Sequence, residues 1–231
     1  MKPKLFKIGI WLIMSGLVII SVTIWLGFMW APSVSSDAFN DPYAQKIFYW
    51  HVPAAWASFI AFALLFVGSL MWFWKRSEWG WHLHSSAAEL GAIFGLMVIT
   101  SGPIWASAEW GTPWDWTDVK LNTYAVLTGL ALFLVITRKT QPDGIETRDT
   151  LSAMGLFGFV LVPLTFFASR IWKQRHPGGL VETEGAIHPD MMQVLLIGWF
   201  GFTLLLIGQI ILLFEASKLE LKLEKLQQRL D

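Results

Sequence analysis

The chain has 231 residues, of which 55% are hydrophobic and 15% are charged, with 17 basic and 17 acidic side chains. The apolar residues fall in blocks of about twenty, which is typical of membrane spans and excludes both a soluble domain and a disordered chain. A formal net charge of zero provides no basic face for nucleic acid. Because the sequence has no cysteine, disulfides, thiol ligands and a Cys-x-x-Cys-His site for covalent haem are excluded as well.

Six long apolar runs are present, and the shortest has 17 residues, about 26 Å of helix. Backbone polar groups in lipid must be bonded within their own segment, so these runs predict six transmembrane helices. Pro103 and Pro163 predict kinks in the third and fifth helices. The expected spans are Ile8–Trp30, Val52–Trp74, Ser86–Ala108, Leu121–Thr137, Leu151–Ser169 and Met191–Phe214.

Six spans place both termini on the same side of the membrane. Twelve basic residues fall on that side and five on the other, so the positive-inside rule predicts cytoplasmic termini. The fold class is therefore all-α, a polytopic bundle of six transmembrane helices, over residues 1–214. The basic cluster at Arg170–Arg175 is an exception to this rule. The five basic residues predicted on the outer side are Lys46, Lys120, Arg170, Lys173 and Arg175.

Residues 215–231 form the only separable piece, a tail that follows the last span. Its leucines recur at spacings of four, three and four, which predicts an amphipathic helix that continues the span into the cytoplasm. Two interpretations stay open: a helix on the membrane surface and a docking element for a cytoplasmic partner. The leucines are Leu219, Leu223, Leu226 and Leu230.

The chain has 15 tryptophans, and three of them lie within seven positions of the outer segment 109–121. Trp110, Trp114 and Trp116 are separated by Gly111 and Pro113, so they do not form one regular helix face. Clustered rings beside carboxylates predict a platform for a flat apolar ligand with a polar rim. An aromatic belt at the membrane surface explains the more scattered rings, which are Trp25, Trp30, Trp56, Trp72, Trp74, Trp79 and Trp81.

The histidines divide between the two sides of the membrane. His82 and His84 fall in a predicted cytoplasmic loop, Lys75–Ser85, where we expect interfacial side chains with no ligand role. His51, His176 and His188 fall on the outer side, and two neutral imidazoles facing each other would hold a six-coordinate haem iron. The sequence has no metalloprotease, di-iron or phosphate-loop motif, so it predicts no nucleotide hydrolysis by this chain.

Three outer elements carry a resemblance to a known family. They are Tyr49-Trp50-His51-Val52-Pro53-Ala54-Ala55, Trp110-Gly111-Thr112 with Trp114, Trp116, Asp118 and Leu121, and Trp172-Lys173-Gln174-Arg175-His176. The second is similar to the "WWD" signature of haem-handling membrane proteins. With six spans and this length, the chain resembles the CcmC family, the haem exporter C proteins of cytochrome c maturation.

The resemblance implies a site. His51 and His176 would be the axial ligands of haem iron, with His188 second in rank to His176. Pro113 stands where the family has a tryptophan, Thr117 is an inserted residue, and Lys120 replaces an arginine and loses its forked geometry. The haem ring would lie on the signature segment, and its propionates would contact basic side chains. The further haem-binding residues that the resemblance implies are Trp110, Trp114, Trp116, Asp118, Lys120, Arg170 and Arg175.

The resemblance also implies a function without enzymatic activity: non-covalent binding of haem b at the periplasmic face of the bacterial inner membrane, and delivery to the haem chaperone CcmE. The implied partners are CcmA and CcmB, an ABC-type pair, and the small protein CcmD. The alternatives are a haem lyase-type subunit and a b-type electron-transfer cytochrome. The cytochrome is disfavoured because no predicted span has a histidine in its interior. A permease is disfavoured because Glu89 is almost the only charge within a span.

Overall fold

The computed structural model describes residues 3–34, 40–172 and 187–227, and within these ranges all regular structure is helical. Six helical segments are long and apolar enough to cross a membrane, which confirms the predicted fold class. The elements are α1 (Pro3–Met29), a short 3₁₀ helix η1 (Ala44–Ile47), α2 (Phe48–Lys75), α3 (Glu78–Trp110), α4 (Val119–Thr140), α5 (Ile145–Gly158), α6 (Leu161–Ile171) and α7 (Pro189–Gln227).

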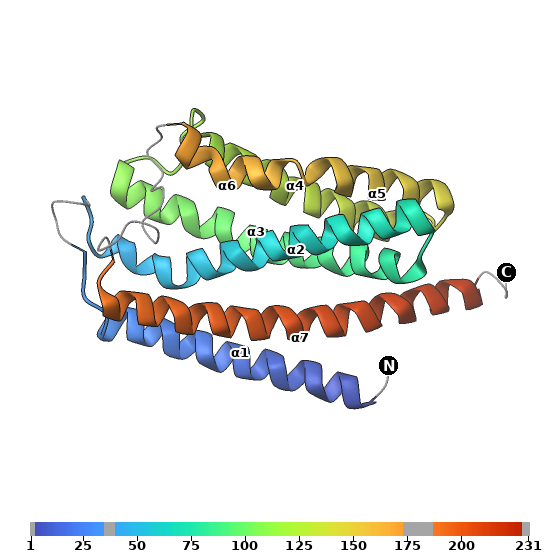
Figure 1. The fold of residues 1–231 in the computed structure, drawn as a ribbon, viewed down its shortest axis with the longest axis horizontal. Coiled ribbons are helices and arrows are strands. Elements are labelled where there is room, and N and C mark those ends of the chain that lie inside the picture. The colour runs from blue at the N-terminus through green and yellow to red at the C-terminus, as the bar shows by residue number, and fades with distance from the viewer. Residues whose placement is uncertain (1–2, 35–39, 173–186, 228–231) are drawn as a thin grey trace.

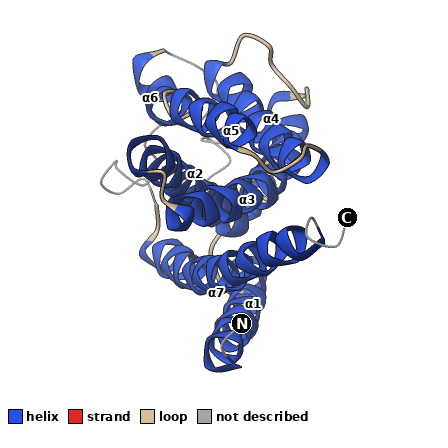
Figure 2. Cartoon of the chain, turned by 90° about the vertical axis from the view of Figure 1, so that its right-hand side faces the viewer, coloured by secondary structure: helices blue, strands red, loops and turns tan. Residues whose placement is uncertain are grey.

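The helices form three layers (Figures 1 and 2). The helices α1 and α7 lie side by side in one layer, α2 and α3 form the middle layer, and α4 with α5 and α6 forms the third. The first residues of α1 and the last residues of α7 lie at one end of the bundle, which we call the tail end. The segment between α3 and α4 lies at the opposite end, which we call the site end.

Glycines allow the paired helices to approach closely. A Cβ atom built on Gly16 of α1 would lie 2.8 Å from the carbonyl oxygen of Gly201 in α7. A Cβ on Gly68 of α2 would lie 2.4 Å from the backbone nitrogen of His84 in α3. Small residues at such crossings bring backbones together in membrane bundles, so these two helix pairs depend on them.

We expect Gly68→Ala to destabilise the protein by about 1–3 kcal/mol, because the new methyl group would overlap backbone atoms of α3 that cannot rotate away. Gly129→Ala in α4 is the matched control, since a Cβ there meets nothing within 4 Å. That variant should be up to about 1 kcal/mol more stable, because alanine is the better helix former. Thermal unfolding of both variants in detergent measures the difference, and equal midpoints would contradict the close packing.

The predicted loop Lys75–Ser85 is wrong. Helix α2 ends at Lys75, Arg76 adopts a left-handed conformation with φ 50°, and α3 begins at Glu78. The Ser77 side chain accepts a hydrogen bond from the Gly80 N–H, so it caps α3. The turn between these helices is therefore only two residues long, and α3 starts eight residues before the predicted span.

His82 and His84 consequently lie in α3 and are buried, not interfacial. The Nδ1 atom of His84 lies 2.9 Å from the Ser69 hydroxyl of α2, and its ring stacks on Trp81. The Nδ1 atom of His82 lies 3.0 Å from the Ser217 hydroxyl of α7. Both imidazoles therefore have a partner on another helix, and they belong to the packed tail end.

Two of the tryptophans assigned to an aromatic belt are core residues instead. Trp72 is 4% exposed and Trp81 is 3% exposed, and the guanidinium of Arg148 lies over both rings. Arg148 also binds Glu78 and Asp143, with nitrogen to oxygen distances of 2.9 and 2.5 Å. This arrangement joins α2, α3 and α5 at the tail end, where cation–π contacts and ion pairs satisfy a buried charge.

The fifth span is broken near its proline, as predicted. Helix α5 ends at Gly158, α6 begins at Leu161, and Pro163 lies in the first turn of α6. Pro163 has no N–H for the Phe159 carbonyl, which accepts from Val162 at 3.0 Å instead. In the third span, Pro103 lies inside α3, which is helical on both sides of it.

Helix α7 continues without a break from the last span to Gln227. Ser217 is buried, and both Ser217 and Glu220 accept hydrogen bonds from Arg138 of α4. Arg138 also pairs with Glu89 of α3 at 3.2 Å. The polar side of the tail thus faces the bundle, and its leucines are exposed; these are Leu219, Leu223 and Leu226.

Candidate functional site

His51 lies in the first turn of α2, at the site end of the bundle. The helix begins at Phe48, so His51 belongs to the helix and not to a loop. Its Nδ1 atom lies 2.8 Å from the hydroxyl oxygen of Ser101 in α3. Gly102 places no side chain beside the imidazole, since a Cβ there would lie 3.4 Å from His51 Cε1. The ring is therefore held against α3 by one hydrogen bond.

This hydrogen bond determines which nitrogen of His51 carries the proton. The Ser101 hydroxyl donates its own hydrogen to the Met97 carbonyl at 2.6 Å, so its oxygen accepts from His51. In a neutral imidazole one nitrogen is protonated and the other has a lone pair. With the proton on Nδ1, the lone pair is on Nε2, and this is the form that binds a metal.

Two further features lie near His51: the positive charge of Lys120 and the last turns of α3. Lys120, in the first turn of α4, is close enough for its charge to act on His51. Helix α3 continues past Ser101 to Trp110, which adds about 14 Å of helix. Trp105 and Trp110 on this extension make an edge contact, with ring centroids 5.1 Å apart.

The tryptophan loop, which is the segment 111–118 after α3, holds a second pair of tryptophans. Gly111 ends α3 with φ 72°, a left-handed conformation that glycine adopts without strain. The rings of Trp114 and Trp116 are 5.8 Å apart at an interplanar angle of 57°, and Trp116 is 83% exposed. The three predicted platform residues Trp110, Trp114 and Trp116 therefore lie within nine residues of the α3–α4 connection, with an exposed indole among them.

Two carboxylates of this connection have structural partners. Asp118 is 2% exposed and caps α4, accepting a hydrogen bond from the Leu121 N–H at 3.0 Å. Asp115 accepts from the backbone N–H and the hydroxyl of Thr117, at 2.9 and 2.6 Å. Thr117 thus lies in a local turn that Asp115 stabilises.

Glu109 and Lys46 were not singled out from the sequence as site residues, yet they position the segment that precedes α2. Both Glu109 carboxylate oxygens accept backbone N–H bonds, from Asn40 and Asp41 at 3.0 Å each. Lys46 is 3% exposed, and its ammonium donates to the Ala31 carbonyl at 2.5 Å. These bonds attach the segment before α2 to the ends of α3 and α1. In the sequence, the position of Glu109 directly after the apolar run Ser86–Ala108 was the signal that could have indicated this role.

The remaining predicted residues divide between described and undescribed positions. His176 and Arg175 lie outside the described residues. Arg170 lies near the end of α6, with its guanidinium over the Phe166 ring and a hydrogen bond to the Phe166 carbonyl at 3.2 Å. The Nδ1 atom of His188 accepts the Asp190 N–H at 3.2 Å and lies 3.6 Å from a carboxylate oxygen of the same residue.

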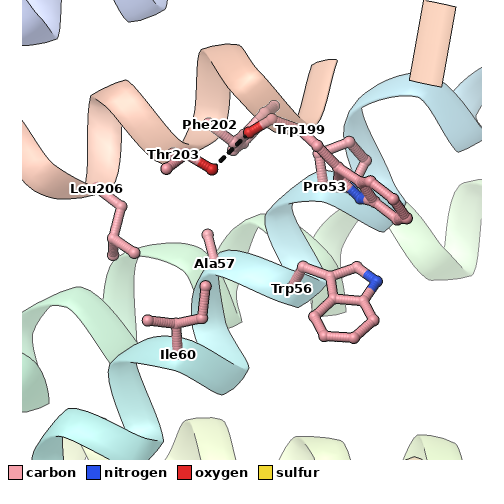
Figure 3. Close-up of a pocket in the computed structure, with 8 residues that line it drawn as sticks. All are labelled: Pro53, Trp56, Ala57, Ile60, Trp199, Phe202, Thr203 and Leu206. Carbon is pink, nitrogen blue, oxygen red and sulfur yellow. Dashed lines mark hydrogen bonds between the residues drawn. The ribbon is translucent and has the colours of Figure 1, made fainter. Parts of the chain in front are cut away.

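An apolar groove of about 320 Å³ lies between α2 and α7 (Figure 3). The Thr203 hydroxyl on its wall donates to the Trp199 carbonyl at 2.7 Å. The eight residues that line the groove are Pro53, Trp56, Ala57, Ile60, Trp199, Phe202, Thr203 and Leu206. No histidine or carboxylate is among them, so the groove is not the ligand site predicted from the sequence.

Comparison of the sequence with known proteins shows its family. The family described as CcmC, Heme exporter protein C, matches residues 4–229. The Heme exporter protein C of Rhodobacter capsulatus is 25% identical over 211 residues, covering 90% of this chain and 87% of the relative. That of Escherichia coli K12 is 26% identical over 206 residues, covering 88% and 82%. A putative cytochrome c biosynthesis ccmC-like mitochondrial protein of Marchantia polymorpha is 26% identical over 173 residues, covering 74% and 71%. Because the family match extends over nearly the whole sequence, this chain belongs to the Heme exporter protein C family.

Proposed function

We propose that this chain binds haem b non-covalently at its site end and delivers it to the haem chaperone CcmE during cytochrome c maturation. The observation that carries the proposal is His51, whose Nδ1 is occupied by Ser101 so that Nε2 keeps a lone pair for iron. Haem here is cargo, so a ligand that binds without a covalent bond suits a protein that must also release it.

The axial ligands we propose are His51 and His176. The engaged Nδ1 of His188 supports its lower rank, because that imidazole must first give up its bond to the Asp190 N–H. Two buried histidines within a span reopen the alternative of a b-type cytochrome, since His82 and His84 lie in α3. They are two residues apart on one helix, so they point in different directions and cannot face each other across one porphyrin.

The tryptophans and basic residues supply the rest of the proposed site. The porphyrin would stack on Trp110, Trp114 and Trp116, and its propionates would form charge-assisted bonds with basic side chains. Asp118 supports the site through the cap that it provides to α4. The proposed propionate partners are Lys120, Arg170 and Arg175.

Six apolar helices make the chain an integral membrane protein. We place it in the bacterial inner membrane, with the site end in the periplasm and both termini in the cytoplasm, because twelve basic residues lie on the side of the termini. It would act as a delivery component with CcmA, CcmB and CcmD and would itself hydrolyse no nucleotide. The tail beyond residue 214 is a candidate contact for a cytoplasmic subunit of that system.

Haem transfer tests this function directly. The purified, lipid-containing chain is loaded with haem and mixed with haem-free CcmE, and the two are separated. We expect haem to move to CcmE from the wild type. Haem that binds, cycles reversibly between oxidation states and does not leave in the presence of CcmE would contradict delivery and favour a b-type cytochrome. A wild-type chain that binds no haem would contradict the proposed site itself.

A further inference from the structure

Asn122, in the first turn of α4, connects the tryptophan loop to the helix that follows it. Its side-chain oxygen accepts a hydrogen bond from the indole N–H of Trp114 at 3.2 Å. Its side-chain nitrogen donates to the carbonyls of Trp116 and Asp118, at 2.9 and 2.7 Å. The same nitrogen makes a longer contact with the Asp115 carbonyl at 3.5 Å, so one amide side chain binds the loop at four places.

The chemistry of the partners fixes the orientation of this amide. An indole N–H only donates and a backbone carbonyl only accepts, so the amide oxygen must face Trp114 and the amide nitrogen must face the loop carbonyls. Turning the amide by 180° would set donor against donor and acceptor against acceptor. Each of its two N–H groups and its oxygen then has a partner within the loop or its cap.

Asn122 bonds the Trp114 indole itself, whereas the Thr112 hydroxyl bonds only the Trp114 backbone carbonyl, at 3.0 Å. Trp116 is 83% exposed, so packing against the protein does not determine its position. Its ring contacts Trp114, and the Trp114 ring is held through its N–H by Asn122. The loop is short and contains Gly111 and Pro113, neither of which offers a side chain for such bonds. Asn122 is therefore the described side chain that acts directly on the indole of this pair, through the Trp114 N–H.

We propose that Asn122 is a positioning residue that sets the orientation of the Trp114–Trp116 pair for stacking on the flat ligand. This proposal rests on the proposed haem-binding function. Asn122 acts through Trp114 and does not itself contact the ligand. Ligand binding is then favoured because the aromatic surface is ordered before the ligand arrives.

The test is a double-mutant cycle in the full-length, lipid-containing protein. Asn122→Leu keeps the size of the side chain and removes its hydrogen bonds, and we expect the dissociation constant for haem to rise about tenfold. In the Trp114→Phe background there is no indole N–H to place, so the same substitution should raise it much less. An equal rise in both backgrounds would mean a general effect on α4 and would overturn the proposal.

A measurement without haem separates this inference from the function on which it rests. In protein labelled with ¹⁵N-tryptophan, the Trp114 indole signal is identified by its loss in Trp114→Phe. We expect Asn122→Leu to shift that signal toward the position of an unbonded indole. Thr123→Val is the control, because the Thr123 hydroxyl bonds Thr165 of α6 and not the loop, and it should change neither signal nor affinity.

The outcomes are distinct. A wild type that binds no haem contradicts the proposed function, whatever the indole signal does. A wild type that binds haem, together with an Asn122→Leu variant of unchanged affinity and unchanged indole signal, overturns the positioning role alone. A loss of affinity in Thr123→Val as large as that in Asn122→Leu would also overturn it.

Discussion

His51→Ala should lower the affinity for haem by about two orders of magnitude or more, because it removes the imidazole that we assign to iron. The purified variant should carry little haem, and the absorption bands of a six-coordinate haem should be absent. The protein should still fold, since among residues 3–34, 40–172 and 187–227 the His51 side chain makes one hydrogen bond, to Ser101.

His188→Ala is the matched control for this experiment. The sequence also predicts His188 on the outer side, but its Nδ1 accepts the Asp190 N–H, so the loss of its side chain should leave the haem content unchanged. In His51→Gly, added imidazole should restore the six-coordinate spectrum by taking the vacated position. Normal haem content in His51→Ala, or loss of haem in His188→Ala alone, would contradict the assignment of His51.

Ser101→Val should raise the dissociation constant for haem about 10- to 100-fold, the usual effect of losing the partner that orients a metal-binding histidine. Without the hydroxyl, His51 Nδ1–H has no acceptor in α3, and the tautomer with the proton on Nε2 becomes populated. The bound imidazole should also be a weaker electron donor, so we expect the reduction potential of the haem to rise.

Ser101→Thr separates this effect from packing. Threonine keeps the hydroxyl that accepts from His51 and donates to the Met97 carbonyl, so affinity and potential should return toward wild type. The ¹⁵N shifts of the His51 ring in the haem-free protein give an independent readout of the tautomer. Identical shifts in the wild type and Ser101→Val would show that the serine does not determine it.

Hydropathy predicted the spans well because a run of apolar residues needs no partner to be recognised. It missed the first two turns of α3, since Glu78, His82 and His84 lower the local hydropathy although the helix is packed there. Their burial depends on residues far along the chain, such as Ser69 and Ser217. The same reason explains why Trp72 and Trp81 were assigned to the membrane surface: only the fold shows that Arg148 lies over both rings.

The candidate site shows the same division. His51 and the tryptophan loop stand out from residue type and spacing alone. Ser101, Glu109 and Asn122 do not, because a serine, a glutamate or an asparagine near a helix end has many ordinary uses. Their roles follow from bonds that join different elements: Ser101 of α3 to His51 of α2, Glu109 to the segment before η1, and Asn122 to the loop.

We propose that Nε2 of His51 binds haem iron beside the tryptophan loop. A structure of the haem-loaded protein in lipid nanodiscs measures this most directly. We predict iron on Nε2 of His51, with Nδ1 still bonded to Ser101 and the porphyrin face on Trp114 and Trp116. Iron bound elsewhere, or a His51 ring that turns Nε2 away from the porphyrin, would contradict the account.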